Sequence, residues 1–414
     1  MKFIHTADLH LDSPFLGLQD APEDLWQSIQ QSTFTSFERI VDDALKFKID
    51  FICIAGDIFD RDQRSIAAEN FFVRQCSRLQ DANIDVYLSY GNHDYQMVTD
   101  ETKVLPANVH VFGNQVETKT LKLADKTTVA ISGFSYGSRW IDDDQTSEYP
   151  IKANVDWQIG MLHGALTGLK NPHDNYAPFT VQELLDKNYD YWALGHIHKR
   201  QILHRNPIIA YCGNAQGRHR NEAGPKGYYL VTEENQQLVP EFHETAPIDW
   251  QTISLELEET DSAAELVTSL QRQVELQVND TKLTLVSIQL TGSEKLTDEL
   301  IVQLDNGSIL ARLQSQIKDT ATLKFWPYEA KIRVSVDQPS FTSLDQHYWD
   351  EAAQTVFTHE NITQLAEKLF QHSFIADQFS QPQTLTDLQQ AVTMALQTTQ
   401  NQEEQQDEDS ANSN

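Results

Sequence analysis

Short apolar runs alternate with longer amphipathic stretches through the first 240 residues. The runs Phe3–Ala7, Phe51–Ala55 and Val86–Tyr90 have the length and side-chain types of strands. Between them, residues 22–48 and 66–82 carry apolar side chains at helical spacing. The run Phe51–Ala55 is continuously apolar, which is typical of a strand buried on both faces. This order of strands and helices predicts an α/β domain.

Beyond residue 105, strand-like runs follow one another with fewer helices between them. They are Val109–Phe112, Thr127–Ser132, Trp157–Leu162, Tyr191–Leu194, Ile208–Tyr211 and Tyr228–Val231. This pattern fits a layered α/β fold, a sandwich of two sheets flanked by helices, better than one doubly wound sheet.

The pattern changes near residue 245, where a smaller region begins. Its strand-like and helical stretches alternate along the chain as Trp250–Leu257, Ala263–Val278, Leu283–Leu290, 298–318 and Leu323–Val336. We therefore predict one domain over residues 1–245 and a small α+β capping domain over residues 246–340.

The C-terminal part has a helical pattern up to residue 396, with a break at Pro382. Its apolar positions fit either a short bundle or an amphipathic helix that docks a partner. Residues 397–414 are rich in Gln, Asn and acidic residues and lack large apolar side chains. We predict a helical partner-binding segment over 341–396 and a disordered acidic tail over 397–414.

Composition and charge narrow the class of protein. The 414 residues are 40% hydrophobic and 9% aromatic, enough for a sizeable core. The net charge of −30 excludes a globally basic nucleic-acid-binding protein, but not a local basic groove or metal-bridged phosphate contacts. Residues 241–414 hold 9 basic and 29 acidic side chains, which suits a protein partner or solvation better than a DNA backbone.

The chain has no stretch of eighteen apolar residues, and its N-terminus lacks the apolar run of a signal peptide. Three cysteines, Cys53, Cys76 and Cys212, are too few for a disulfide framework. We therefore expect a cytoplasmic protein with reduced thiols and no membrane association.

Five short polar motifs each follow a strand-like run. They are Asp8-Leu9-His10, Gly56-Asp57, Gly91-Asn92-His93-Asp94, His163-Gly164 and Gly195-His196-Ile197-His198. Ligands gather beyond the carboxyl ends of strands in layered α/β folds, so all five motifs can meet in one site. Asp8 with His10, and His196 with His198, are spaced i, i+2, which in extended backbone points both side chains to one side.

The motifs offer oxygen and nitrogen donors from Asp, His and Asn and no sulfur donor. Such a set favours Mn²⁺, Fe²⁺ or Zn²⁺ over a structural zinc cage. One ion cannot use so many ligands, whereas two ions about 3.5–4 Å apart, bridged by one carboxylate, can use them all. Asp57 is the natural bridge.

These motifs, in this order, resemble those of the calcineurin-like metallophosphoesterase superfamily. Within it the chain is similar to the SbcD-like DNA repair exonuclease family, most closely to its bacterial YhaO-type branch, over the segments His5–Asp12, Ala55–Asp60, Leu194–Lys199, Cys212–His219 and Gly224–Gly227. The resemblance covers roughly residues 1–240. It implies two divalent ions, Mn²⁺ foremost, and hydrolysis of DNA.

The resemblance also implies the ligand sets. One metal ion would be held by Asp8, His10, Asp57 and His198. The other would be held by Asp57, Asn92, His163 and His196. A hydroxide bridging both ions would attack phosphorus in line.

The resemblance implies that His93 lies outside the metal shell and protonates the leaving 3′ oxygen as general acid. Asp94 would orient His93. Nuclease members sometimes carry a further His three residues after the bridging Asp, where this chain has Asp60. That difference leaves open how the leaving group or the DNA end is handled.

Basic and aromatic side chains near the motifs are candidate substrate contacts. Arg218 and His219 lie in a basic loop that either contacts a phosphate beside the metals or is solvated surface. Tyr136, Arg139 and Trp140 lie in an irregular stretch that either packs or stacks on an unpaired base.

We interpret the chain as a Mn²⁺-dependent DNA phosphodiesterase, a 3′–5′ exonuclease and single-strand endonuclease of DNA repair. One alternative, favoured by the net charge, is a phosphatase or cyclic-nucleotide phosphodiesterase with the same metals. Another is a metal-binding scaffold for a partner, against which the intact motifs argue. The resemblance further implies DNA, an SMC-like coiled-coil ATPase and a second copy of the chain as partners.

Overall fold

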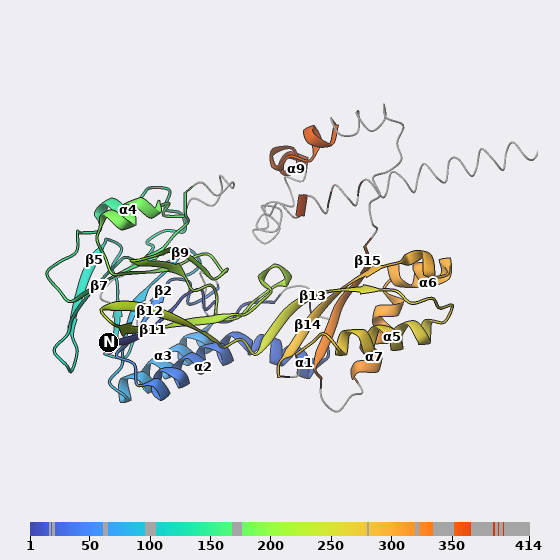
Figure 1. Cartoon of the computed structure of the whole chain (residues 1–414), viewed down its shortest axis with the longest axis horizontal. Helices are drawn as coiled ribbons and strands as arrows, with labels where there is room; N and C mark the ends of the chain where they lie inside the picture. Colours follow the sequence, from blue (N-terminus) through green and yellow to red (C-terminus); the bar gives the residue numbers. More distant parts are fainter. Residues whose placement is uncertain are drawn as a thin grey trace, which may run out of the picture. The chain divides into compact units, whose positions relative to one another are not determined.

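The computed structural model describes residues 1–15, 18, 21–60, 65–95, 105–167, 176–279, 281–318, 323–333 and 352–365, with four single positions beyond residue 383. Figure 1 shows the helices and strands of the described residues, and the chain divides into two units, residues 1–169 with 174–333, and residues 170–173 with 334–414. The predicted segment 341–396 includes helix α9 (His359–Leu365). Most of that segment, and the whole predicted tail 397–414, lie outside the described residues.

The first sheet of the first unit has the strand order β12-β11-β1-β2-β3-β4. In chain order its strands are β1 (Lys2–Thr6), β2 (Phe51–Ala55), β3 (Asp85–Ser89), β4 (Val109–Val111), β11 (Gly227–Glu234) and β12 (Gln237–Glu244). Strands β1 to β4 are parallel, and β11 joins β1 antiparallel. The carboxyl ends of β1, β2 and β3 therefore share one edge of the sheet.

The second sheet has the order β5-β6-β7-β8-β10-β9. Its strands are β5 (Glu117–Lys122), β6 (Thr128–Gly133), β7 (Trp157–His163), β8 (Tyr191–Gly195), β9 (Gln201–Arg205) and β10 (Ile208–Tyr211). Strands β6, β7, β8 and β10 are parallel neighbours. The second sheet thus also presents adjacent carboxyl ends, those of β7 and β8.

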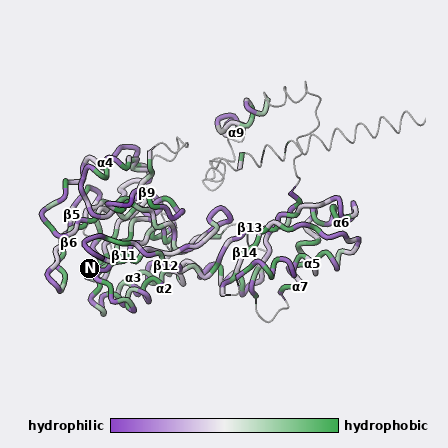
Figure 2. The backbone as a smooth tube through the Cα atoms, in the orientation of Figure 1, coloured by the Kyte–Doolittle hydropathy of each residue, from purple (hydrophilic) through white to green (hydrophobic). Residues whose placement is uncertain are grey.

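The two sheets pack face to face over a shared apolar core. Phe51 and Cys53 of β2 face this core with Ile159 of β7, while Ile52 and Ile54 face the opposite side, towards helices α2 (Ser32–Phe47) and α3 (Ile66–Asp81). Helix α4 (Val181–Asp186) packs on the outer face of the second sheet. In Figure 2 the hydrophobic colour runs along the central strands. The predicted sandwich of two sheets flanked by helices is confirmed.

The predicted helix over residues 22–48 is in fact two helices, α1 (Glu23–Gln30) and α2, which meet at Gln31. The Ser32 hydroxyl donates to the Ile29 carbonyl at 2.6 Å, a local bond that competes with helical pairing. The break lets the two helices bury their apolar faces against different sheets. Leu25 of α1 packs with Trp250 and Leu285 of the small region, and α2 covers the first sheet.

The small region has three parallel strands, β13 (Ile248–Glu256), β14 (Leu283–Thr291) and β15 (Phe325–Ile332). Helices α5 (Ala263–Glu275), α6 (Asp298–Asp305) and α7 (Ser308–Lys318) pack on one face of this sheet, and α1 packs on the other. Because the strands are parallel and joined by helices, the region is a small α/β unit rather than the mixed α+β arrangement that we expected.

The predicted single helix over residues 298–318 is divided into α6 and α7. Gly307 stands between them with φ +80°, a left-handed conformation that glycine adopts without a steric penalty. Among the described residues, no helix is both long and apolar enough to cross a membrane.

Candidate metal centre

The five predicted motifs meet beyond the carboxyl ends of β1, β2, β3, β7 and β8. Backbone hydrogen bonds join the first two motifs, from Asp8 N to Gly56 O (3.1 Å) and from His10 N to Asp57 O (3.0 Å). Across the sandwich, the backbone N–H of His196 donates to both carboxylate oxygens of Asp8, at 3.0 and 3.2 Å. Loops of both sheets therefore build one site.

The backbone at these motifs is not the extended chain that the i, i+2 spacing suggested. Asp8, His10, Asp57 and His196 have φ values of 51°, 44°, 52° and 98°. Non-glycine residues seldom adopt positive φ, and each instance costs about 1–3 kcal/mol. The left-handed turns, rather than strand alternation, bring the side chains of these motifs together.

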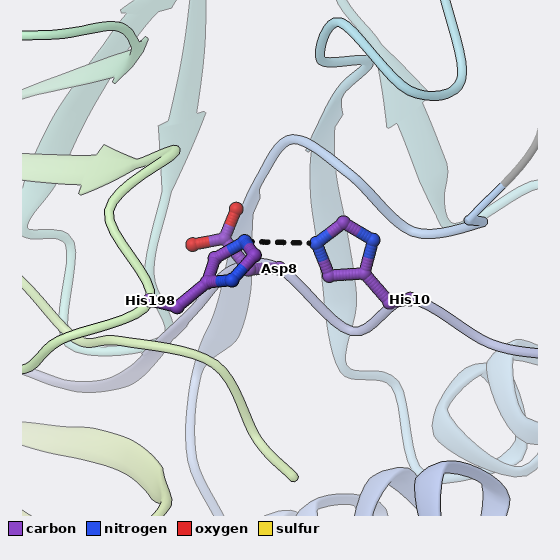
Figure 3. A group of neighbouring side chains, drawn as sticks. All are labelled: Asp8, His10 and His198. Carbon is purple, nitrogen blue, oxygen red and sulfur yellow. Dashed lines mark hydrogen bonds between the residues drawn. The ribbon is translucent and has the colours of Figure 1, made fainter. Parts of the chain in front are cut away.

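One group of side chains comprises Asp8, His10 and His198, which offer ligand atoms within 4.8 Å of one another (Figure 3). The two imidazoles approach with Nε2 atoms 3.0 Å apart. Nδ1 of His198 lies 2.6 Å from a Glu222 oxygen, and Nδ1 of His10 lies 3.1 Å from an Asp60 oxygen. With a proton on each Nδ1, the two Nε2 lone pairs would face each other, an arrangement that suits a bound cation.

The second group contains His163, Asn92 and His196. Nδ1 of His163 lies 3.0 Å from the Ala55 carbonyl oxygen, so the ring donates there and keeps a lone pair on Nε2. That Nε2 lies 2.9 Å from Oδ1 of Asn92, which is also 3.2 Å from Nδ1 of His196. Asn92 Oδ1 and the two histidine nitrogens therefore converge, as the ligand atoms of one metal ion would.

Asp57 lies between the two groups. Its Oδ2 is 3.7 Å from His10 Nε2 in the first group and 3.5 Å from His163 Nε2 in the second. Its Oδ1 accepts a hydrogen bond from the backbone N–H of His93 at 3.0 Å. Gly91 passes so close that a Cβ there would collide with Asp57 Oδ1. This is the placement expected of a bridging carboxylate.

Burial controls the charge of the site. It raises the pKa of Asp8, and the nearby Asp57 adds to this effect. Burial alone would also raise the pKa of Asp57, but His163 and other neighbouring histidines lower it below its ordinary value. Burial lowers the pKa of His10 to about 3 and also lowers that of His198. Neutral imidazoles offer lone pairs and Asp57 keeps its negative charge, so the donor set fits hard or borderline divalent ions.

His93 lies at the rim of this centre, with its side chain 31% exposed. Its Nδ1 is 3.1 Å from the carbonyl oxygen of Asp60. Asp94 accepts backbone N–H bonds from Ile58 (2.7 Å), Phe59 (3.2 Å) and Gly91 (2.8 Å). Asp94 therefore braces the two loops that carry Asp57 and His93, and its predicted role in orienting the His93 ring stays a prediction.

Glu222 is a site residue that no sequence motif pointed to. It is the last residue of the short helix η2 (Arg220–Glu222) and is 7% exposed. Its second oxygen accepts from Asn214 Nδ2 and from the Arg218 backbone N–H, both at 2.7 Å. A carboxylate that receives the Nδ1 proton of a ligand histidine fixes the ring and raises its basicity. Its position in a loop far from the motifs left no signal in the sequence.

The two predicted substrate contacts, Arg218 and His219, differ in how accessible they are to a substrate. Arg218 is 13% exposed; its guanidinium pairs with Asp60 and lies 3.5 Å from Glu222. Arg218 thus links the carboxylates beside His10 and His198, and its charge is already compensated. His219 is 44% exposed and lies 3.1 Å from Glu222. A phosphate contact stays a prediction for both, and His219 is the more accessible of the two.

Other candidates have structural partners. His5 is fully buried, with Nδ1 2.9 Å from the Tyr191 hydroxyl and Nε2 3.1 Å from the Leu194 carbonyl. Tyr136 is also buried and donates its hydroxyl proton to the His163 carbonyl at 2.9 Å. Cys53, Cys76 and Cys212 are free thiols in the core.

The chain is similar in sequence to several known proteins. A model of the calcineurin-like phosphoesterase family matches residues 1–200. The chain is 41% identical over 277 residues to the uncharacterized metallophosphoesterase YhaO of Bacillus subtilis, covering 66% of this chain and 67% of that protein. It is 29% identical over 245 residues to the DNA double-strand break repair protein Mre11 of Methanocaldococcus jannaschii, covering 56% and 62%.

A solved structure, a dimetal phosphatase from Danio rerio, is similar at 10% identity and a TM-score of 0.38, over 59% of this chain and 96% of that one.

Proposed function

The chain belongs to the calcineurin-like phosphoesterase family, and we propose that it is a metal-dependent DNA phosphodiesterase, acting as a 3′–5′ exonuclease and single-strand endonuclease. The observation that carries the proposal is the position of Asp57 between two groups of nitrogen and oxygen donors. DNA as substrate is supported by the names of the archaeal relatives.

The ligands of the two ions would be Asp8, His10, Asp57 and His198 on one side and Asp57, Asn92, His163 and His196 on the other. Two bound divalent ions, with Mn²⁺ as the first candidate, would lower the pKa of the attacking water and neutralise phosphoryl charge. Asp60 and Glu222 would hold the two histidines of the first group with their Nε2 atoms directed inward.

His93 would act on the leaving group. As water adds to phosphorus and the bond from phosphorus to O3′ breaks, a proton must reach O3′. With Nδ1 next to the Asp60 carbonyl, a protonated ring at the partly exposed rim can release the proton on Nε2 and keep the bond to Asp60. The products are a 3′ hydroxyl and a 5′ phosphate.

A digestion assay tests the proposal. End-labelled duplex DNA, circular single-stranded DNA and bis-para-nitrophenyl phosphate are incubated with Mn²⁺ and either the wild-type protein or His93→Ala. We expect the wild type to degrade DNA, and the variant to retain its metal but lose about 10²–10⁴-fold in turnover.

Two results would contradict parts of the proposal. Full turnover by metal-loaded His93→Ala would remove His93 from the chemistry. Cleavage of the small diester without cleavage of either DNA would favour the alternative of a phosphodiesterase for small substrates such as cyclic nucleotides, which the net charge of −30 also favours. An SMC-like ATPase partner and a homodimer remain predictions, tested by copurification and by the molecular mass in solution.

A further inference from the structure

We propose that Trp140, stacked on Tyr176 beside His196, forms a stacking site for one unpaired nucleobase of the substrate strand. This inference rests on the proposed hydrolysis of DNA at the adjacent metal centre. It narrows the substrate to strands whose bases can leave the duplex stack near the reacting phosphate.

A continuous series of ring contacts leads from the metal centre to the surface. The rings of His163 and His196 have centroids 5.2 Å apart, and the Tyr176 ring lies 4.8 Å from that of His196. Trp140 stacks on Tyr176 at 5.0 Å with an interplanar angle of 17°. At the outer end of the series Trp140 is 55% exposed. An exposed indole held parallel to a second ring is suited to receiving a base.

Hydrogen bonds tie the backbone segments that carry both rings to the loops of the metal centre. The backbone N–H of Ala177 donates to the Ile141 carbonyl at 2.7 Å, and that of Ala165 donates to the Tyr176 carbonyl at 2.8 Å. The Ser138 hydroxyl donates to the Trp140 carbonyl at 2.8 Å. Because Ala165 lies two residues after His163, the stacking residues are tied to the loop that follows a proposed metal ligand.

Arg139 supplies a positive charge at the same place. Its guanidinium carbon lies 5.5 Å from the Trp140 ring centroid, near the outer limit of a cation–π contact, so a base can displace it easily. In the part of the chain that the structure describes, Arg139 forms no ion pair. It is available to a phosphate of the nucleotide whose base stacks on Trp140.

Stacking also explains how so acidic a chain would hold a nucleic acid. Near the metal centre, Arg218 pairs with Asp60, Arg220 lies 3.6 Å from Glu329, and Lys226 donates to the His198 carbonyl at 2.8 Å. These three cationic groups therefore already have polar partners. Base stacking on an aromatic ring depends less on net charge and tolerates every sequence.

Binding of labelled strands tests the proposal. Anisotropy is measured in EDTA, which prevents hydrolysis, with a thymidine octamer and with an octamer of abasic spacers. We expect Trp140→Ala to bind the thymidine octamer about tenfold or more weakly than wild type, and Trp140→Phe to stay within about threefold. Ile151→Ala, which removes another exposed apolar side chain (59%), is the matched control and should bind as wild type.

The abasic octamer separates stacking from a structural effect. Equal affinity of wild type and Trp140→Ala for abasic strands supports the inference. A parallel loss for both strands overturns it, as would unchanged binding of the thymidine octamer by Trp140→Ala, or no binding by wild type. If Trp140 governs binding but Mn²⁺ restores no cleavage, the stacking site stands and the proposed nuclease activity fails.

Discussion

The two sheets of the sandwich and the small parallel sheet of residues 248–333 differ in how many polar side chains they bury and in their backbone conformation. At the metal centre of the sandwich, Asp8, Asp57 and Glu222 are buried with histidines, and four proposed ligands have left-handed backbone. In the described part of residues 248–333, the buried polar side chains are Thr284 and Ser287, and only glycines have positive φ. Buried charge and positive φ at non-glycine residues are therefore found at the metal centre and are absent from the described part of residues 248–333.

This difference indicates which residues serve stability and which serve chemistry. Strained backbone and buried charge persist only where the surrounding structure supports them, and both cluster at functional sites. Changes at the centre should therefore act mainly on activity and metal affinity. Changes in the small sheet should act mainly on the free energy of unfolding.

The largest effect is expected for Asp57→Asn. The substitution keeps the shape of the side chain but removes the negative charge between the two donor groups, so hydrolysis should fall by about 10³-fold or more. Hydrolysis of bis-para-nitrophenyl phosphate with Mn²⁺ measures it. Asp125→Asn, at an exposed turn, is the control. Activity within tenfold of wild type would show that Asp57 is not the bridge.

Ile288→Ala tests the small sheet, where we expect a loss of stability and no change in metal affinity. Ile288 is fully buried in β14, within the core that α5, α6 and α7 cover. Loss of its side chain should lower the free energy of unfolding by about 2–5 kcal/mol. Urea denaturation gives this value, and calorimetry should show metal affinity equal to that of wild type. A variant with normal stability and weakened metal binding would reverse the assignment of roles.

Glu222→Gln should lower metal affinity by about 10–100-fold, because the His198 ring loses its carboxylate partner. Burial alone would raise the pKa of Glu222, but Arg218 and His198 lower it well below its ordinary value. An acid with a lowered pKa stabilises the fold at pH values above its unfolded pKa, about 4.5. That contribution disappears as the pH falls through the lower, folded value.

The stability of metal-free wild type and Glu222→Gln should therefore converge at low pH and differ at neutral pH. Denaturation between pH 3 and 7 measures the difference. Parallel stability curves over this range would show that the charge of Glu222 plays no part.

The smallest effect is expected for Trp250→Phe. Trp250 Nε1 donates to the Gly217 carbonyl at 2.9 Å and so joins β13 to the loop that carries Arg218 and Glu222. Loss of this bond should cost about 1 kcal/mol of unfolding free energy, with little change in turnover. Thermal denaturation and the Mn²⁺ assay measure the two quantities. A large loss of turnover at normal stability would show that the small sheet controls the site.

Much of the fold could be predicted because its strands are short, apolar and buried. The run Phe51–Ala55 coincides with β2, and the predicted helix over residues 66–82 nearly coincides with α3, which Ser65 caps by accepting from Ala68 N at 3.0 Å. The break at Gln31 escaped prediction because it depends on which sheet each helix meets. Periodicity within one segment carries no such information.

The parts of the site that lie in sequence motifs could be predicted. Asp8, Asp57 and His163 stand in recognisable motifs, and the structure brings them together. The left-handed turns could not be read from residue spacing, because φ depends on the loops that pack around each residue. Glu222 and the pairing of Arg218 escaped prediction because they depend on contacts between distant parts of the chain.

Titration of Mn²⁺ into metal-free protein, followed by calorimetry and by hydrolysis of bis-para-nitrophenyl phosphate, tests the central claim most directly. The arrangement around Asp57 predicts two equivalents per chain in the wild type, with activity rising as the second ion binds. Binding of no ion, or full activity with a single equivalent, would contradict a two-metal centre.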